Sequence, residues 1–290
     1  METVDCPICT CSTFERYLAS FDVKVSKKEF HIVKCKRCGF AYTNPRPDFS
    51  EINYCYGPNY YSYKEVPAVN FDSPEKAARK HLDVGCGSGK FLVRKASEGF
   101  DSYGVEIDPA TIQKAREKGL KVLHVDEFFE FFPDEYFDLI TLNQSMEHIH
   151  QLIEMVSELN RILKTCQGRL MINVPNLESY DSELWGRNWR HLDVPRHLYH
   201  FTCESITKLL QSHKFEVLDI RTYNMPVLSR NLSYFKGIYT SYRMLLNNKD
   251  RRCAAVEFLR CLTNMLRFIA NNKKKLGQNG QFIFVSALKK

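Results

Sequence analysis

The sequence lacks any uncharged apolar run of about 18 residues, which is roughly the length an α-helix needs to cross a bilayer. This absence predicts a protein without a transmembrane helix. The first residues, METVDCPICT, lack the basic and apolar stretches of a secretory signal. The cysteines number eleven, an odd count, and several fall within apolar segments. Together these features predict a cytoplasmic protein with reduced thiols rather than a disulfide framework.

Glycine is scarce, with 13 in 290 residues, yet three glycines stand at alternate positions in residues 81–93, HLDVGCGSGKFLV. A P-loop is absent, because Phe91 follows Lys90 where Ser or Thr is required. The dinucleotide fingerprint G-x-G-x-x-G is absent too, because its third glycine would fall at Lys90. Two of the three cofactor classes that use such a loop are therefore excluded.

Two acidic residues distinguish this loop from a phosphate-binding loop. Asp83 stands two residues before the first glycine, where it would repel a pyrophosphate but attract a cationic group. Glu106 closes the next apolar stretch, GVEID, and can accept hydrogen bonds from both hydroxyls of a ribose. The pattern favours a nucleoside that carries a positive charge.

From residue 80 onward, apolar stretches alternate with amphipathic ones. Strands are predicted over residues 80–86, 102–108, 120–126, 137–143, 168–176, 215–224 and 281–290. Between them, one predicted helix starts at Pro109 and ends at Gly119, and another carries an apolar face of Leu152, Met155, Val156, Leu159 and Ile162. This order implies right-handed crossovers, a parallel sheet and a ligand at the carboxyl ends of the strands.

Four cysteines form two C-x-x-C pairs that 25 residues separate: Cys6, Cys9, Cys35 and Cys38. Two residues between thiolates let both reach one ion from a tight turn, and Gly39 after the second pair eases that turn. The segment resembles a zinc ribbon and predicts structural Zn²⁺, with an iron–sulfur cluster or redox thiols as alternatives. Four thiolates close the coordination sphere, so a catalytic zinc-bound water is not expected.

The predicted fold class is α/β: a Rossmann-like, mostly parallel sheet of seven strands, with a small N-terminal zinc ribbon and a helical insertion before the last strand. The predicted segments are 1–45 (zinc-ribbon-like), 46–78 (tyrosine-rich linker or lid), 79–224 (core), 225–280 (basic helical insertion) and 281–290 (final strand). As a lid, the second segment would bring Tyr60, Tyr61 or Tyr63 to the ligand.

The stretches LDVGCGSG, GVEID, FDLITLNQSMEH and GRLMINVPN, in this order, resemble the class I S-adenosylmethionine-dependent methyltransferases. The resemblance implies that Asp83 faces the cofactor's amino group and that Glu106 binds its ribose. Ile107 would pack on the adenine, and Asp126 would bind the adenine amino group unless it only caps a helix. The loop itself, with Gly85, Cys86, Gly87 and Gly89, would pass under the methionine, and Asn143 and Gln144 would line the methyl-transfer site.

Two histidines are candidates for a general base. His197 stands in a loop rich in tryptophan, arginine and histidine, and His148 follows the fourth predicted strand, where it could equally orient a loop. His191 and His200 are weaker candidates, and Trp185 and Trp189 are either core or an acceptor platform. Ubiquinone-type O-methyltransferases carry E-x-x-E-H here, but Gln144 replaces the first Glu, which argues against a catalytic divalent metal.

The basic charge is concentrated in residues 224–290, which contain thirteen Lys and Arg and two acids. Their balance is +11, so the rest of the chain carries −4 of the net charge of +7.

The leading hypothesis is a methyltransferase acting on a small, anionic acceptor such as a sugar, a nucleotide sugar or a glycan precursor. Deoxysugar methyltransferases with zinc ribbons resemble the chain in domain order. An RNA methyltransferase is the alternative, since phosphates attract Lys and Arg, and a non-catalytic binding module is the third. The insertion would serve as a helical cap, a homodimer surface or a basic face for anionic lipid or substrate.

Overall fold

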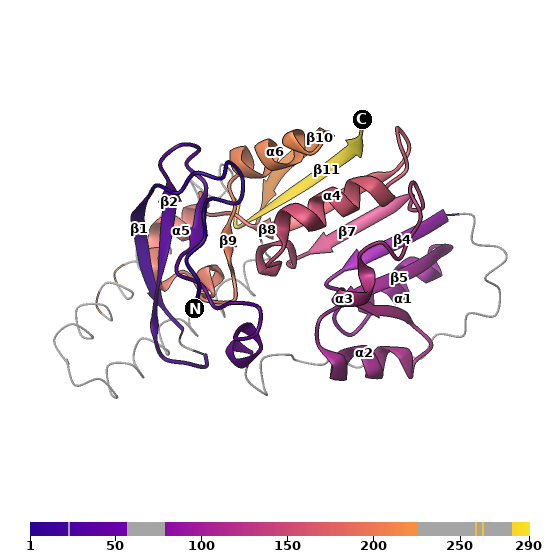
Figure 1. Cartoon of the computed structure of the whole chain (residues 1–290), viewed down its shortest axis with the longest axis horizontal. Helices are drawn as coiled ribbons and strands as arrows, with labels where there is room; N and C mark the ends of the chain where they lie inside the picture. The colour runs from indigo at the N-terminus through magenta and orange to yellow at the C-terminus, as the bar shows by residue number, and fades with distance from the viewer. Residues whose placement is uncertain (23, 57–78, 225–258, 260–262, 264–279) are drawn as a thin grey trace. The chain divides into compact units, whose positions relative to one another are not determined.

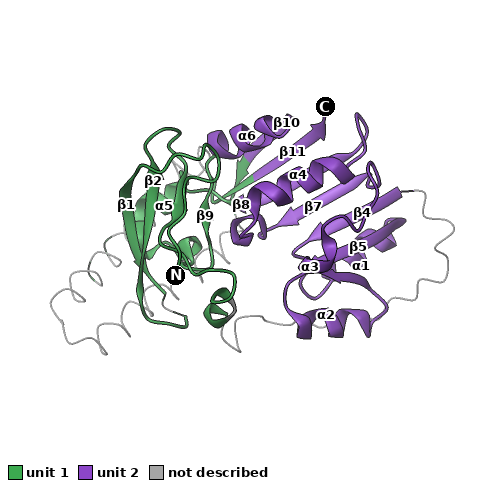
Figure 2. Ribbon diagram, in the orientation of Figure 1, with its two compact units in different colours: residues 1–57, 175–202, 222–283 green, residues 58–174, 203–221, 284–290 purple. Residues whose placement is uncertain are grey.

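The computed structural model describes residues 1–22, 24–56, 79–224, 259, 263 and 280–290 (Figure 1). The chain divides into two compact units, coloured in Figure 2. Unit 1 comprises residues 1–57, 175–202 and 222–283, and unit 2 comprises residues 58–174, 203–221 and 284–290. Each unit combines segments that are distant in the sequence.

Almost all of a seven-stranded sheet belongs to unit 2, with the strand order β10-β11-β8-β7-β4-β5-β6. The strands are β4 (Arg79–Val84), β5 (Phe100–Glu106), β6 (Lys121–His124), β7 (Leu139–Asn143), β8 (Arg169–Pro175), β10 (Phe215–Tyr223) and β11 (Phe282–Lys289). The pairs β4–β5, β5–β6, β4–β7 and β7–β8 are parallel. The chain runs outward from β4 to β6 and then returns to β7 on the other side of β4. The boundary between β4 and β7 is therefore the topological switch point.

The strands form where the apolar runs predicted them. In β4 the last four residues are buried, as expected for a central strand of a parallel sheet covered on both faces. Helix α1 (Lys90–Ser97) packs on β4 and β5, and α2 (Pro109–Arg116) packs on β5 and β6. Asp108 caps α2, because its Oδ2 accepts a hydrogen bond of 2.9 Å from the Thr111 N–H.

The remaining helices of unit 2 are α3 (Val125–Phe128), α4 (Leu152–Ile162) and α6 (Cys203–Ser212), with a 3₁₀ turn, η3, over Met146–His148. The apolar stripe predicted for α4 is confirmed, because all five of its residues are at most 1% exposed. The predicted α/β fold with seven mostly parallel strands is likewise confirmed.

Unit 1 contains a four-stranded sheet with the order β1-β2-β3-β9. Its strands are β1 (Phe14–Phe21), β2 (Glu29–Cys35), β3 (Ala41–Thr43) and β9 (Tyr199–His200), all paired antiparallel. The sequence segmentation ended the N-terminal segment at residue 45 and did not anticipate β9. The sheet instead recruits residues from beyond β8, since Tyr42 pairs with Tyr199.

The core of unit 1 combines the two parts of the chain. Short helices α5 (Tyr180–Trp185), η4 (Gly186–Asn188) and η5 (Arg190–Leu192) follow β8, and η1 (Ile52–Cys55) follows β3. Trp185 and Trp189, 5% and 4% exposed, join one buried cluster with Phe30 and Ile32 of β2. Of the two roles open for the tryptophans, their burial favours packing.

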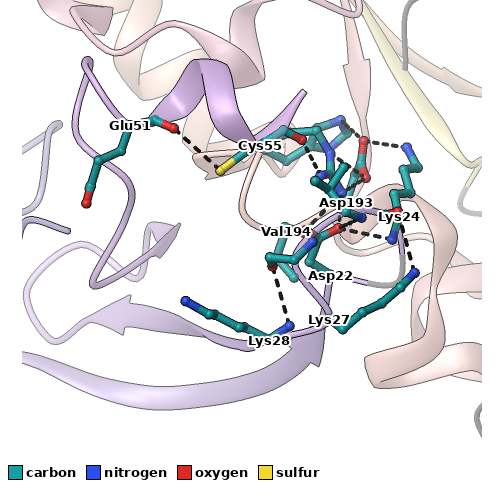
Figure 3. Close-up of polar contacts among 12 residues, drawn as sticks. Asp22, Lys24, Lys27, Lys28, Glu51, Cys55, Asp193 and Val194 are labelled. Atoms are coloured by element: carbon teal, nitrogen blue, oxygen red, sulfur yellow. Dashed lines mark hydrogen bonds and ion pairs between the residues drawn. The ribbon is translucent and has the colours of Figure 1, made fainter. Parts of the chain in front are cut away.

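A buried cluster of charges fastens the turn after β1 to the segment before β9 (Figure 3). The Arg196 guanidinium, 1% exposed, donates to Asp22 Oδ1 at 2.8 Å and to Asp193 Oδ1 at 2.8 Å. Asp22 also accepts backbone N–H groups of the turn, and Lys24 Nζ reaches Asp193 Oδ2 at 2.9 Å. Buried charges of this kind are retained only when they are paired and hydrogen-bonded.

Several sequence expectations fall outside the described residues. These are the lid tyrosines Tyr60, Tyr61 and Tyr63 and nearly all of the basic insertion at 225–280. Within the described part of the chain, no helix is both long and apolar enough to cross a membrane.

Candidate active site

The glycine-rich loop connects β4 to α1 at the switch point of the sheet. All three glycines adopt positive φ, which favours glycine over residues with a side chain. The space around the first two differs. A Cβ on Gly85 would lie 2.4 Å from Cβ of Ser145, which stands between β7 and η3, so this segment and the loop can approach only because that Cβ is missing. A Cβ on Gly87 would meet no atom of the described residues within 4 Å. The loop is therefore closely packed at its start and has open space at its centre.

Cys86 sits between these glycines, but its side chain points into the core. It is 8% exposed and packs with Leu92 and Ile112, and burial raises the pKa of its thiol well above the ordinary value. Its N–H donates to the carbonyl of Val105 at 3.0 Å. Any ligand contact made by Cys86 would therefore come from its backbone rather than from a reactive thiolate.

Asp83 lies in β4 just before the loop and is 3% exposed. Its Oδ1 accepts a hydrogen bond of 2.7 Å from Thr141 Oγ1 of β7. Burial raises the pKa of Asp83 to about 7, against the lowering effect of hydrogen bonds from Thr141 and Asn143. A buried carboxyl with so high a pKa is a candidate for function, because a cationic ligand would compensate its charge.

Glu106 ends β5 and is 7% exposed. Its Oε2 accepts the Gly87 N–H at 2.8 Å, and its Oε1 accepts the N–H groups of Ile107 and Asp108 at 2.8 and 3.2 Å. The carboxylate is thus oriented by three backbone donors. Oε1 accepts two of them and Oε2 only one, so Oε2 keeps a lone pair for a ligand. Ile107, predicted to pack on an adenine, is half-buried directly after it.

The remaining predicted cofactor residues lie at the ends of the neighbouring strands. Asn143 is exposed at the end of β7, and Gln144 follows with φ 56°, its N–H bonded to the carbonyl of Asn173 in β8 at 2.8 Å. Asp126 lies in α3 with 70% of its side chain exposed, and its Oδ2 is 3.3 Å from His124 Nδ1. The helix cap is His124 rather than Asp126, so the capping role considered for Asp126 does not apply.

The two histidines predicted as bases belong to different units. His148 lies half-buried in η3 of unit 2, where its N–H donates to the carbonyl of Ser145 at 3.0 Å. His197, in unit 1, is 7% exposed. Because a carbonyl can only accept, Nδ1–H of His197 donates to His191 O at 2.9 Å, and Nε2 lies 3.9 Å from Asp193 Oδ2.

The surroundings of His197 set its electrostatics. Burial alone would raise the pKa of Asp193, but the charges of His197, Arg196 and Lys24 lower it well below its ordinary range. Asp193 is therefore a carboxylate that can stabilise a proton on His197. His191 and His200 are poorer bases, because burial lowers their pKa values to about 4 and about 3.

The four predicted metal ligands come together in unit 1. Their sulfur atoms all lie within 4.8 Å of one another, and the Cys6–Cys38 and Cys9–Cys35 separations are 3.5 Å. The two turns match, because Thr10 N–H donates to Cys6 O and Gly39 N–H donates to Cys35 O. Zn–S bonds of about 2.3 Å in a tetrahedron place sulfurs about 3.8 Å apart, so the donor set fits this ion.

Three buried residues beneath the loop were missed by the sequence reasoning: His81, Ser102 and Thr141. They are 0%, 1% and 2% exposed, and together with Asp83 they form a hydrogen-bonded chain across three strands. The available signal was a histidine two positions before Asp83, in a strand that is otherwise apolar at its buried end.

A glycine loop at the switch point, flanked by one acid on each of two adjacent strands, defines a nucleoside-binding α/β domain of the doubly wound class. The methyltransferase domain family matches residues 60–220, which is more than half of the chain. The chain therefore belongs to the methyltransferase domain family, and the prediction of an S-adenosylmethionine-dependent methyltransferase is confirmed at this level.

Proteins with similar sequences include O-methyltransferases. The ubiquinone biosynthesis O-methyltransferase of Photorhabdus laumondii is 35% identical over 78 residues, 24% of this chain and 32% of that protein. The probable tocopherol O-methyltransferase of Oryza sativa is 35% identical over 102 residues, covering 31% and 28% of the two chains. The chain thus spans about a third of the length of these relatives. A solved methyltransferase structure from Archaeoglobus fulgidus is 21% identical, with a TM-score of 0.49 and coverage of 74% and 87%.

Proposed function

We propose that the chain transfers a methyl group from S-adenosylmethionine to a hydroxyl oxygen of a small molecule. The observation that carries this proposal is the pair of strand-end carboxylates, Asp83 and Glu106, on either side of a loop with open space at Gly87. One carboxylate suits a cationic amino group and the other suits a ribose diol. The O-methyltransferases among the relatives support an oxygen acceptor.

The sulfonium supplies an activated methyl group, so the protein has little covalent work to do. Asp83 would hold the amino group, Glu106 the ribose hydroxyls and Ile107 one face of the adenine. Asn143 and Gln144 would line the transfer site beside the loop. Holding donor and acceptor in line is the main contribution expected from such a site.

A hydroxyl acceptor must lose its proton as its oxygen attacks the methyl carbon and the carbon–sulfur bond breaks. His197 would take that proton at Nε2, since its Nδ1–H is held by the carbonyl of His191. Asp193 would then face the resulting imidazolium. His148 is the second candidate for this role.

The proposed acceptor class is a sugar, a nucleotide sugar or a glycan precursor. The supporting pattern is the W…D-x-P-x-H…F series over residues 189–201, which resembles a bacterial methyltransferase group of glycan and small-molecule pathways. An RNA acceptor remains the alternative, on the strength of the basic residues 224–290. We place the enzyme in the cytoplasm, because an odd number of cysteines, several within apolar segments, favours reduced thiols over a disulfide framework.

The cysteine cluster of unit 1 would hold structural Zn²⁺. Cys6, Cys9, Cys35 and Cys38 supply four sulfur ligands and would leave no open coordination position for a water. Its proposed role is to tie the turn before β1 to the turn between β2 and β3.

The decisive experiment has two stages. Calorimetry would first measure binding of S-adenosylmethionine and S-adenosylhomocysteine to the purified protein. Release of S-adenosylhomocysteine would then be followed with panels of nucleotide sugars, phenols and bulk RNA. Methylation of a small hydroxyl compound supports the proposal, salt-sensitive turnover on RNA would favour the alternative, and no cofactor binding by folded protein would refute both.

A further inference from the structure

The chain of buried polar residues beneath the glycine loop runs across three strands of unit 2. His81 of β4 lies between Ser102 of β5 and Thr141 of β7, at 3.2 Å from Nδ1 to Ser102 Oγ and 2.9 Å from Nε2 to Thr141 Oγ1. Thr141 Oγ1 in turn lies 2.7 Å from Asp83 Oδ1. The chain therefore ends on the carboxylate proposed to hold the cofactor's amino group.

His81 is held in its neutral form. Its ring is fully buried against the rings of Phe91 and Phe100, with centroids 5.6 and 6.0 Å away. Burial, with a smaller contribution from the charge of Lys95, lowers its pKa to about 3. A neutral imidazole has one N–H donor and one lone-pair acceptor, so each nitrogen in this chain can play only one part.

The direction of every hydrogen bond follows from Asp83. An ionised carboxylate only accepts, so the Thr141 hydroxyl donates its single proton to Asp83. Thr141 must then accept from His81, which makes Nε2 the protonated nitrogen. Nδ1 is left with a lone pair and accepts from the Ser102 hydroxyl. All of the donors point toward Asp83.

The tautomer matters because Thr141 has competing acceptors. The carbonyl of Leu82 lies 3.4 Å from its hydroxyl. If His81 were protonated at Nδ1, its unprotonated Nε2 would accept a hydrogen bond from the Thr141 hydroxyl. In either case an oxygen lone pair would face the carboxylate, and the ionised form of Asp83 would lose its donor. In contrast, donation from Nε2–H polarises the hydroxyl toward Asp83.

We propose that His81 is a positioning residue of the cofactor site: as the Nε2–H tautomer it fixes the Thr141 hydroxyl on Asp83 and keeps that carboxylate ionised and oriented for the amino group of S-adenosylmethionine. This rests on the proposed function, because it assigns Asp83 to that amino group. Other groups that act on Asp83 are Asn143, Glu106 and Arg94. These three side chains are not members of the hydrogen-bonded series from Ser102 through His81 and Thr141 to Asp83. Substituting His81 or Thr141 therefore leaves them in place.

Two ligands separate this role from a general loss of structure. S-adenosylhomocysteine carries the amino group, whereas 5′-methylthioadenosine has the same nucleoside without the amino-acid part. In calorimetry, His81→Leu should weaken S-adenosylhomocysteine about tenfold, equivalent to about 1.4 kcal/mol, and leave 5′-methylthioadenosine within about twofold. His81→Gln, whose amide can donate near the position of Nε2, should restore most of the loss. Thr141→Val removes the same donor with little change in shape and should match His81→Leu.

The matched control is His200→Leu in unit 1, which breaks another buried His–Thr pair, His200 Nε2 to Thr43 Oγ1 at 3.2 Å. It should lower stability without changing the ratio of the two affinities. Equal weakening of both ligands by His81→Leu and Thr141→Val, or no weakening of either, would overturn the inference. Wild-type protein that binds neither ligand would instead refute the proposed function.

A measurement on the wild-type protein needs no substitution. The ¹⁵N resonances of the His81 ring distinguish a protonated from an unprotonated nitrogen. We expect Nε2 to be protonated and Nδ1 to be a hydrogen-bond acceptor from pH 7.5 upward. Protonation at Nδ1 in the protein with S-adenosylhomocysteine bound would contradict the proposed direction of the chain.

Discussion

The backbone N–H of Gly87 donates to Oε2 of Glu106 at 2.8 Å, although the two residues stand 19 positions apart in the sequence. This bond ties the centre of the glycine loop to the end of β5. The side chain proposed to bind ribose also holds the loop proposed to pass under the methionine. Loop shape and nucleoside recognition therefore depend on one carboxylate.

Replacing Glu106 tests that dual role. Glu106→Ala should weaken S-adenosylhomocysteine about 10- to 100-fold, since one or two hydrogen bonds to a charged group are lost. Glu106→Gln keeps one acceptor oxygen for Gly87 and should lose less. The control is Glu127→Gln, an exposed carboxylate of α3 that accepts from the His124 N–H. Calorimetry on all three variants measures the effect, and a Glu106→Ala protein that binds as tightly as wild type would contradict the site.

Cofactor affinity should depend on pH through Asp83. The cofactor's ammonium group requires the carboxylate, and the free protein has an Asp83 pKa of about 7. Affinity for S-adenosylhomocysteine should therefore be constant above pH 7 and fall about tenfold per pH unit below it. 5′-Methylthioadenosine should show no such fall. Calorimetry from pH 5.5 to 8.5 gives both profiles, and parallel profiles for the two ligands would be evidence against the assignment.

The same carboxyl should cost stability in the free protein at high pH. Its folded pKa lies above the ordinary value of 3.8, so the folded state binds the proton more tightly than the unfolded state. Asp83 therefore contributes stability below about pH 4, and this contribution is lost as pH rises through about 7. Asp83→Asn should raise the melting temperature relative to wild type at pH 8 more than at pH 5, while abolishing tight cofactor binding. A difference independent of pH would show that Asp83 is not protonated in the free protein.

Sequence patterns predicted unit 2 far better than unit 1, for a physical reason. The buried strands of a parallel sheet are continuous apolar runs, and the helices between them carry a 3.6-residue period, so local sequence reports both. Strand-end residues such as Asp83 and Glu106 follow from that order. In unit 1 the pairing of β3 with β9 joins residues 42 and 199, and nothing in the two-residue strand Tyr199–His200 signals its partner.

The unpredicted part of the site depends on distances across the sheet. His81, Ser102 and Thr141 lie on three different strands. Their alignment follows from the parallel register, in which His81 pairs with Ser102 of β5 and Asp83 pairs with Thr141 of β7. A single histidine in a strand indicates no partner by itself. The buried pairing of Arg196 with Asp22 is similar, because 174 residues separate the two.

Removing one thiol of the cysteine cluster should remove bound zinc. Cys38→Ser should lower zinc content from about one ion per chain toward zero, because structural sites need all four ligands. Cys38→Ser should also lower the melting temperature, and removing the zinc from wild-type protein with a chelator should lower it by a similar amount. Cys11→Ser is the matched control: Cys11 is buried nearby, but its sulfur contacts Thr13 and not the cluster. Elemental analysis measures the zinc content of each protein, and melting curves measure its stability. If wild-type protein prepared in the presence of zinc retained no zinc, that result would count against a zinc site.

His197 should affect turnover rather than cofactor binding. His197→Asn keeps an N–H that can reach the carbonyl of His191 but has no group at the position of Nε2. Turnover with a hydroxyl acceptor should fall about 10²- to 10⁴-fold, the usual contribution of a general base. Affinity for S-adenosylhomocysteine should stay within about twofold. Unchanged turnover would transfer the role to His148, to be tested by His148→Asn.

The buried Arg196 should be a large determinant of the stability of unit 1. Arg196→Met removes the cation between Asp22 and Asp193 and leaves two carboxylates in a buried site. Such a loss costs about 3–5 kcal/mol of the free energy of unfolding. Arg187→Met breaks the more exposed ion pair with Glu29 and should cost less than about 1 kcal/mol. Urea denaturation followed by the fluorescence of Trp185 and Trp189, both in the core of unit 1, measures the difference, and equal costs for the two variants would refute a structural role for the buried cluster.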